Sequence, residues 1–231
     1  MKISGLQKLT LLDYPEHLAA ILFLPGCSFR CPFCQNSSLV LTPEQEPEIS
    51  IDELQQFLKK RSGILEGICV TGGEPTLHAD LPQLLQLIQD AGYQIKLDTN
   101  GSNPHMLETL LQEGLLDYAA MDIKAGRENY AHVCGTNVRM EDIARSAELL
   151  KTSRIPYEFR TTVVKGLHTE QDFFDIADWL CGSPAYYLQS FRDCPEVLQR
   201  DHHFSAFSKE EMLQFLTIVQ KKIPTAALRE A

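Results

Sequence analysis

The sequence predicts an α/β fold, specifically an incomplete and laterally open (β/α)6 barrel of the TIM type. Apolar strand-like segments alternate with helix-like segments, and turn signals separate them, which is the pattern of a parallel sheet. About six such units can be counted, fewer than the eight that close a barrel. The 231 residues are also at the low end of the length of closed barrels. We find no internal repeat, low-complexity tract or linker, and therefore expect one domain over residues 1–231.

The elements follow from local patterns. Ala19–Leu24 is an uninterrupted apolar run and is predicted to be the first strand. Ser50 and Glu53 have the spacing of a capping box, and Leu54, Phe57 and Leu58 are predicted to supply the buried face of the helix that Ser50 begins. Further strands are expected at 67–71, 94–98, 118–123, 157–164 and 185–189, and further helices at 81–89, 106–112, 141–150, 171–180 and 209–222. The polar segments 42–47 and 193–207 are predicted to be surface loops.

Charge and composition exclude several classes of partner. The chain has 21 Lys and Arg against 31 Asp and Glu, a net charge of −10, and no long basic run, so we do not expect nucleic acid to be its main partner. The strongest apolar run, residues 18–24, is far shorter than a membrane span, so no membrane association is expected. We see no basic apolar leader that would predict secretion. Seven cysteines, three of them clustered, do not suggest a disulfide framework, and we expect a reducing cytoplasm.

Three cysteines stand within eight residues, as Cys27, Cys31 and Cys34. Gly26 and Pro32 favour a loop there, and a loop can wrap all three thiolates around one small iron–sulfur cluster. Three thiolates on a four-iron cube leave one iron without a protein ligand, where a substrate or cofactor can bind. The spacing therefore indicates redox or radical chemistry at a [4Fe–4S] cluster.

A zinc site is the alternative interpretation, with His17 or His78 as the fourth ligand. Zinc modules usually have a second cysteine pair or a histidine pair, and this chain has neither near the triplet. The other four cysteines are scattered singly. Cys69 lies in an apolar strand and is predicted to be a small buried hydrophobe, while no role is assigned to Cys134, Cys181 or Cys194.

Polar groups recur at the carboxyl ends of the predicted strands, where the active sites of α/β barrels lie. A single Gly-Gly or Asp-x-Asn-Gly is usually only a turn. Six strand ends with polar or metal-binding groups indicate a site instead. They are the cysteine triplet, Thr71-Gly72-Gly73-Glu74-Pro75, Asp98-Thr99-Asn100-Gly101, Asp122-Ile123-Lys124, Arg160 and Gln189.

The cysteine triplet, with Phe33 before its last cysteine and Gly72-Gly73-Glu74-Pro75 downstream, resembles the radical S-adenosylmethionine superfamily. Three further motifs are similar to those of its glycyl-radical-enzyme activases, and most similar to the activases of anaerobic ribonucleoside-triphosphate reductases. These motifs are Leu9-Thr10-Leu11-Leu12-Asp13-Tyr14-Pro15, Asp98-Thr99-Asn100-Gly101 and Asp122-Ile123-Lys124. The resemblance extends from about residue 2 to residue 189.

The resemblance implies a function. Cys27, Cys31 and Cys34 would hold the [4Fe–4S] cluster, and its open iron would chelate the amino and carboxylate groups of S-adenosylmethionine. Reductive cleavage would then give a 5′-deoxyadenosyl radical, chemistry that belongs to the cofactors. The enzyme would install a glycyl radical on the large subunit of a glycyl-radical enzyme under anaerobic conditions. A low-potential donor such as flavodoxin or ferredoxin would supply the electron.

The resemblance also implies a set of cofactor-binding residues. Gly72 and Gly73 would let the backbone approach the methionyl moiety, and Glu74 would anchor a donor beside the methionine ammonium. Phe33 would lie against the adenine. Asp98, Thr99 and Asp122 would line the carboxylate and ribose side and would also bind a small monovalent cation. Lys124 and Arg160 would place positive charges near the methionine carboxylate. Gln189 would line the same pocket.

Each residue has a simpler structural interpretation as well. Phe33 could be core packing, Asp98 could make a turn, and Arg160 could pair with Glu158 on the surface. The pair His202-His203 lies far from the cysteines in the sequence, and we predict that it is solvated.

The region between Cys34 and Cys69 contains no cysteine, so the sequence favours activases with a single cluster, as for anaerobic ribonucleotide reductase and pyruvate formate-lyase. Three alternatives stay open at this point. The chain could be a pyruvate formate-lyase-type activase, a radical enzyme acting on a small molecule, such as a deazapurine synthase, or a metal-stabilised binding module without turnover.

Overall fold

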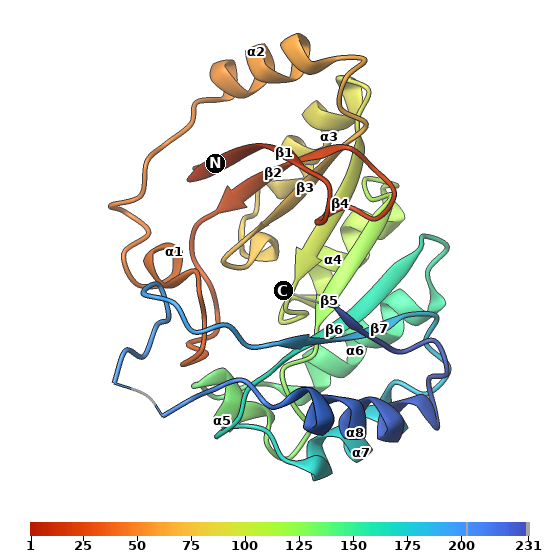
Figure 1. Cartoon of the computed structure of the whole chain (residues 1–231). Coiled ribbons are helices and arrows are strands. Elements are labelled where there is room, and N and C mark those ends of the chain that lie inside the picture. The colour runs from red at the N-terminus through yellow and green to blue at the C-terminus, as the bar shows by residue number, and fades with distance from the viewer. Residues whose placement is uncertain (202, 230–231) are drawn as a thin grey trace.

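Eight strands form one sheet in the order β1 to β8 in the computed structural model, which describes residues 1–201 and 203–229. β1 pairs with β2 in antiparallel fashion, and every following pair is parallel. β1 and β8 are the two edges of the sheet, so the barrel is not closed (Figure 1). The strands are β1 Gly5–Thr10, β2 Ala19–Leu24, β3 Gly67–Gly72, β4 Gln94–Thr99, β5 Tyr118–Asp122, β6 Tyr157–Val163, β7 Tyr186–Ser190 and β8 Ala227–Arg229.

The helices that connect the strands cover the outer face of the curved sheet, where α3, α4 and α6 lie behind the strands in Figure 1. α4 packs on α6, and α7 packs on α8. None of the helices in the described part of the chain has the length and apolar character needed to cross a membrane. The helices are α1 Ser37–Leu41, α2 Ile51–Arg61, α3 Leu81–Asp90, α4 Pro104–Gln112, α5 Tyr130–Cys134, α6 Met140–Thr152, α7 Glu170–Trp179 and α8 Lys209–Gln220, with a 3-10 turn η1 at Pro75–Leu77.

Side-chain caps explain where several helices begin. The predicted capping box of α2 is present, because the Ser50 hydroxyl accepts from the Glu53 amide and the Glu53 carboxylate accepts from the Ser50 amide. α4 begins two residues earlier than predicted, since the Asn103 side chain caps the helix and Pro104 occupies its first position. The Asn-Pro pair was the sequence signal for that start.

The six predicted strands are present as β2 to β7, in sequence order, with ends that shift by one residue at most. The sequence reasoning missed β1, β8 and the two five-residue helices α1 and α5. β1 is an edge strand whose residues are mostly exposed or half-buried, so it lacks the continuous apolar run of β2. β8 has three residues, too few for any periodicity to be recognised.

The two faces of the sheet differ in chemistry. On β6, Phe159, Thr161 and Val163 are buried, while Glu158 and Arg160 alternate with them and point to the other face. The register sets Asp122 of β5 beside Arg160 of β6. The inner face of the barrel therefore carries charged side chains, and the apolar core lies mainly between the sheet and the helices.

Candidate active site

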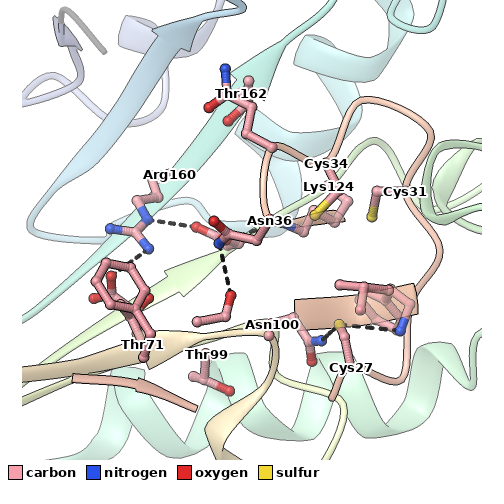
Figure 2. A pocket seen from close by; sticks show the side chains of 18 of the residues that line it. Cys27, Cys31, Cys34, Asn36, Thr71, Thr99, Asn100, Lys124, Arg160 and Thr162 are labelled. Carbon is pink, nitrogen blue, oxygen red and sulfur yellow. Dashed lines mark hydrogen bonds and ion pairs between the residues drawn. The ribbon is translucent and has the colours of Figure 1, made fainter. Parts of the chain in front are cut away.

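One pocket of about 390 Å³ lies inside the barrel at the carboxyl ends of the strands (Figure 2). Its volume is in the usual range for small-molecule sites. Twelve of the thirteen residues predicted as cofactor or metal ligands line it, and Glu74 is the exception. The twelve are Cys27, Cys31, Phe33, Cys34, Gly72, Gly73, Asp98, Thr99, Asp122, Lys124, Arg160 and Gln189.

The cysteine loop (residues 25–34) follows β2 and forms one wall of this pocket. Its three thiols are free, with Cys31 buried and Cys27 and Cys34 half-buried. The loop is held by backbone bonds: the Gly26 amide donates to Leu39 O at 2.8 Å, and the Arg30 amide donates to Cys134 O at 2.9 Å. Because the loop is tied to both α1 and α5, its thiols face the pocket in a fixed arrangement.

The segment after β7 (residues 191–201) packs against the cysteine loop. The amide of Leu198 donates to Cys34 O and that of Gln199 donates to Pro32 O, both at 2.9 Å, and Val197 is buried. The prediction of a polar surface loop at 193–207 was therefore incomplete, because the first part of this region supports the cysteines. This contact joins residues more than 160 positions apart, and sequence periodicity carries no signal for it.

The thiols have different acidities because their surroundings differ. Burial raises the pKa of Cys27 to about 11 and also raises the pKa of Cys34. The thiol of Cys134 donates a hydrogen bond to Cys31 and lowers the pKa of Cys31. The ammonium group of Lys124 acts to lower the pKa of all three. Lys124 thus favours the thiolate forms that bind iron.

The donor set fits an iron–sulfur cluster better than a single metal ion. Within residues 1–201 and 203–229, no group of three His, Cys, Asp or Glu side chains converges on a point where one ion could sit. Zinc needs such convergence, whereas in a four-iron cube each thiolate binds a different iron. The two histidines considered as zinc ligands are also engaged elsewhere: His78 Nε2 lies 2.8 Å from Pro25 O, and His17 lies beside Glu66.

Gly72 and Gly73 bring the end of β3 against the end of β2. A Cβ on Gly73 would lie 1.9 Å from Gly26 O, and one on Gly72, whose φ is +121°, would lie 2.4 Å from Leu24 O. The physical reason for the two glycines therefore differs from the one expected. Close approach of two backbone segments already requires them, in addition to any approach to a ligand.

Glu74 is fully buried and does not line the pocket, so direct contact with a cofactor does not follow from this geometry. Its carboxylate accepts from the amides of Thr76 and Asn100 at 3.1 and 2.6 Å, and from the hydroxyl of Thr99 at 2.7 Å. Burial raises the pKa of Glu74, and these hydrogen bonds oppose the effect. Glu74 anchors the end of β4 beside the cysteine loop.

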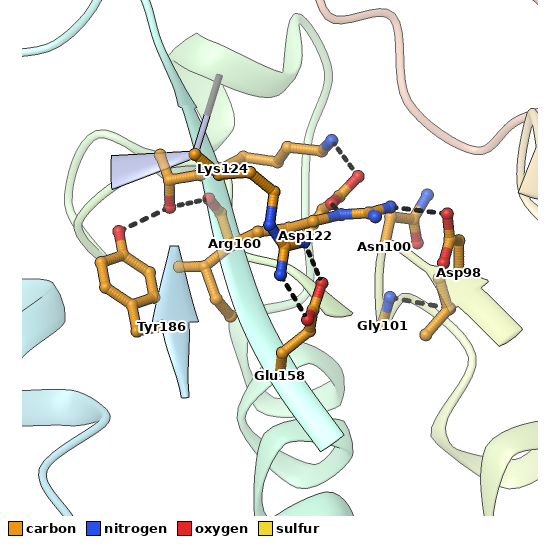
Figure 3. Close-up of polar contacts among 12 residues, drawn as sticks. Asp98, Asn100, Gly101, Asp122, Lys124, Glu158, Arg160 and Tyr186 are labelled. Carbon is orange, nitrogen blue, oxygen red and sulfur yellow. Dashed lines mark hydrogen bonds and ion pairs between the residues drawn. The ribbon is translucent and has the colours of Figure 1, made fainter. Parts of the chain in front are cut away.

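Opposite the cysteines, five charged side chains alternate in sign. Figure 3 shows four of them, Asp98, Arg160, Asp122 and Lys124. Lys96 pairs with Asp98, whose other oxygen lies 2.9 Å from Arg160 Nη2. Arg160 Nε lies 2.5 Å from Asp122 Oδ1, and Lys124 Nζ lies 3.0 Å from Asp122 Oδ2. Burial acts to raise the pKa of Asp98 and of Asp122, but Arg160 and the lysines outweigh it and the pKa of each is lowered. Both aspartates are therefore ionised. The formal charges of the five side chains sum to +1.

Arg160 does not pair with Glu158 on the surface, as the simpler interpretation allowed. Glu158 is buried and accepts two hydrogen bonds from Arg229 of β8, at 2.6 and 2.8 Å, and one from Tyr118 at 2.9 Å. Arg229 thus satisfies the carboxylate, and Arg160 is left to bridge the two aspartates. Sequence reasoning could not separate these pairings, because β8 was not recognised.

Two other predicted residues have mixed surroundings. Phe33 lines the pocket and is also buried, with its ring 6.5 Å from that of His168, so it serves the core and the site together. Gln189 lines the pocket from β7, next to Thr162 of β6. Of the predicted histidine pair, His203 is exposed, and His202 lies outside the described residues.

The sequence analysis did not single out two asparagines that the structure brings to the pocket. Asn36 donates to Gly72 O at 2.9 Å and connects the cysteine loop to β3. Asn100 faces Cys27 from the end of β4 (Figure 2). Asn100 stood within a quoted motif, which was the available signal. Gln7, Asp13 and Thr162 also line the pocket, without a local pattern that distinguishes them.

Known proteins are similar to this chain along most of its length. The family model described as the Radical SAM superfamily matches residues 21–180. A protein of Methanocaldococcus jannaschii named as a glycyl-radical enzyme activating enzyme is 29% identical over 225 residues, which are 95% of this chain and 92% of that protein. A second such protein of the same organism is 29% identical over 183 residues, 77% of this chain and 64% of that one. A 7-carboxy-7-deazaguanine synthase of Aquifex aeolicus is 33% identical over 81 residues, 34% of each chain.

Solved structures share the fold. A radical SAM methyltransferase from Sphaerobacter thermophilus superimposes with a TM-score of 0.73 at 18% identity, over 94% of this chain and 67% of that one. A domain of the pyruvate-formate lyase-activating enzyme from Bacteroides vulgatus gives a TM-score of 0.57 at 19% identity, over 71% of this chain and 99% of that domain.

Proposed function

This chain belongs to the radical SAM superfamily, and we propose that it is a glycyl-radical-enzyme activase. The observation that carries the proposal is the pocket in which three free thiols face a charged wall at the strand ends. Similarity over 95% of the chain to a protein named as a glycyl-radical enzyme activating enzyme supports this class of function. We propose that residues 1–231 act as one domain.

The superfamily implies a [4Fe–4S] cluster and S-adenosylmethionine as cofactors. When bound, they supply the electron and the reactive group for radical formation. Cys27, Cys31 and Cys34 would hold the cluster. The surplus positive charge of the array would favour the methionine carboxylate. Phe33 and Gln189 would complete the pocket around the rest of the cofactor.

A monovalent cation beside Asp98 and Asp122 stays a prediction. The guanidinium of Arg160 lies between the two carboxylates, so a cation there would have to displace at least one of its ion pairs. Binding of S-adenosylmethionine in potassium and in choline chloride, measured anaerobically, would test for it.

The partner is proposed to be the large subunit of an anaerobic ribonucleoside-triphosphate reductase. The gap between the edge strands β1 and β8 leaves the barrel open on one side, and a polypeptide loop needs such an opening. We expect a flavodoxin or ferredoxin to supply the electron. We also expect the cytoplasm to be the compartment, because the seven cysteines are free.

The test is to mix the reduced, reconstituted protein and S-adenosylmethionine with that subunit, and to record electron paramagnetic resonance spectra. We expect a glycyl-radical doublet that collapses to a singlet when the glycine carries deuterium at Cα. Cys31→Ala is the control and should give no radical. A signal with pyruvate formate-lyase alone would keep the activase class and change the partner.

A small-molecule radical enzyme is the second candidate, because the chain shares 33% identity over 81 residues with a deazaguanine synthase. Turnover of a purine-like substrate, without a radical on any glycyl-radical enzyme, would favour it over the activase. A reconstituted protein that binds zinc and forms no iron–sulfur absorption near 400 nm would instead favour the binding module.

A further inference from the structure

Two N–H donors lie beside the sulfur of Cys27. The backbone amide of Phe29 is 3.4 Å from it, and the side-chain Nδ2 of Asn100 is 3.6 Å from it (Figure 2). The first donor belongs to the cysteine loop itself. The second comes from the end of β4, 73 residues away, and only 5% of Asn100 is exposed.

The orientation of the Asn100 amide follows from its other contacts. The backbone amide of Ser102 donates to Asn100 Oδ1 at 2.9 Å, which fixes the oxygen on that side. The nitrogen must then face Cys27, and it also donates to Ser28 Oγ, with 3.3 Å between Nδ2 and Oγ. If the side-chain amide were rotated by half a turn, Asn100 Oδ1 would face the two acceptors, Cys27 Sγ and Ser28 Oγ.

A buried carboxylate holds Asn100 in this place. The carboxylate of Glu74 accepts from the backbone amide of Asn100 at 2.6 Å and from the hydroxyl of the preceding Thr99 at 2.7 Å. The chain turns at Gly101, whose φ of +76° disfavours any side chain and whose carbonyl accepts from the hydroxyl of the buried Ser146 at 2.7 Å. The donor therefore sits on a rigid support and not on a free loop.

We propose that Asn100 is a positioning residue that donates an N–H···S hydrogen bond to Cys27 and thereby raises the reduction potential of the cluster, with Glu74 as its support. The inference rests on the proposed function, because it needs a cluster on Cys27. Hydrogen bonds to the sulfurs are among the factors that set cluster potentials. A donor stabilises the extra negative charge of the reduced state, and the effect is larger where the donor is shielded from water.

The test is a potentiometric titration of the reconstituted protein, followed by electron paramagnetic resonance. Asn100→Asp keeps the acceptor for Ser102 and removes the donor, and Asn100→Ala removes both. We expect each to make reduction about tenfold less favourable, which is a midpoint about 59 mV more negative for one electron. Ser28→Ala removes the hydroxyl that accepts from the Asn100 amide and pairs with Ser102 Oγ, but it keeps both N–H donors to Cys27 and should leave the midpoint unchanged.

A second measurement separates the hydrogen bond from the added charge of the aspartate. Electron–nuclear double resonance of the reduced cluster in H₂O and D₂O should show one exchangeable proton fewer in both Asn100 variants, and none fewer in Ser28→Ala. Unchanged midpoints and proton couplings in Asn100→Ala with full iron content would overturn the inference. A wild-type protein that assembles no cluster would instead overturn the proposed function, so the two failures are distinguishable.

Discussion

Replacing Gly73 with alanine should displace the start of the cysteine loop. The added Cβ would lie 1.9 Å from Gly26 O, a backbone atom that no side-chain rotation can move away. Relief to an ordinary contact of about 3.4 Å requires a shift of about 1.5 Å. That shift would break the hydrogen bond from the Glu74 amide to Gly26 O, now 2.7 Å long.

The magnitude follows from these two effects. The lost hydrogen bond costs about 1 kcal/mol, and overpacking of a tight contact costs about 1–3 kcal/mol. A loss of about 2–4 kcal/mol should lower the melting temperature of the cluster-free protein by roughly 10 °C for a chain of this size. Because Gly26 precedes Cys27, iron incorporation should fall as well, and not only the affinity for S-adenosylmethionine.

The assay is a thermal melt of the cluster-free protein together with iron and sulfide content after anaerobic reconstitution. Gly92→Ala is the control, because a Cβ on Gly92 would meet nothing within 4 Å and only the φ of +87° disfavours a side chain there. It should lose about 1–2 kcal/mol from backbone conformation alone and keep its iron. If Gly73→Ala melts within about 2 °C of wild type and binds iron normally, the packing argument is refuted.

Three further outcomes are expected. Arg160→Met should destabilise the cluster-free protein by about 3 kcal/mol in urea, because the buried Asp98 and the half-buried Asp122 each lose one of their two ion-pair partners. Arg145→Met, at an exposed pair, should cost at most about 1 kcal/mol; equal losses would contradict the array. Leu198→Pro removes the backbone N–H that donates to Cys34 O and should speed the loss of the 400 nm absorption in air. Leu198→Ala keeps this donor and should not. Identical decay of the two variants would show that the segment after β7 does not support the loop. Burial acts to raise the pKa of Glu158, but the ion pair with Arg229 outweighs burial and the pKa is lowered. The stabilisation of the fold by this ion pair is therefore present above the unfolded pKa of about 4.3. It is lost as the pH falls through the folded pKa. The cost of Glu158→Gln, measured from urea midpoints, should therefore be large at pH 7 and shrink below about pH 4; a cost independent of pH would exclude a charged Glu158.

Much of the fold was predictable because its signals are local. β2 to β7 are short apolar runs with turn residues between them, and a parallel sheet buries such strands on at least one face. β1 and β8 escaped prediction for the corresponding reason. An edge strand is partly solvated and a three-residue strand has no period, so neither differs from a loop in composition.

The sequence by itself determined that the three cysteines and most of the polar strand ends share one pocket. Cys27, Cys31 and Cys34 are close in the chain, and the polar strand ends must share one rim once the strands are parallel. These inferences need only the order of the strands and the direction in which each runs.

Only the tertiary structure decided how those residues are paired. Arg160 had carboxylates available on its own strand, on the adjacent β5 and on β4 beyond it, and the register of β5 and β6, together with Arg229, selected Asp98 and Asp122. The amide of Asn100 reaches Cys27 because a buried Glu74 holds the end of β4. Contacts of this kind depend on sheet register and on loop packing between distant parts of the chain. Differences of a few ångströms decide which contacts form, and no pattern along the sequence encodes such differences.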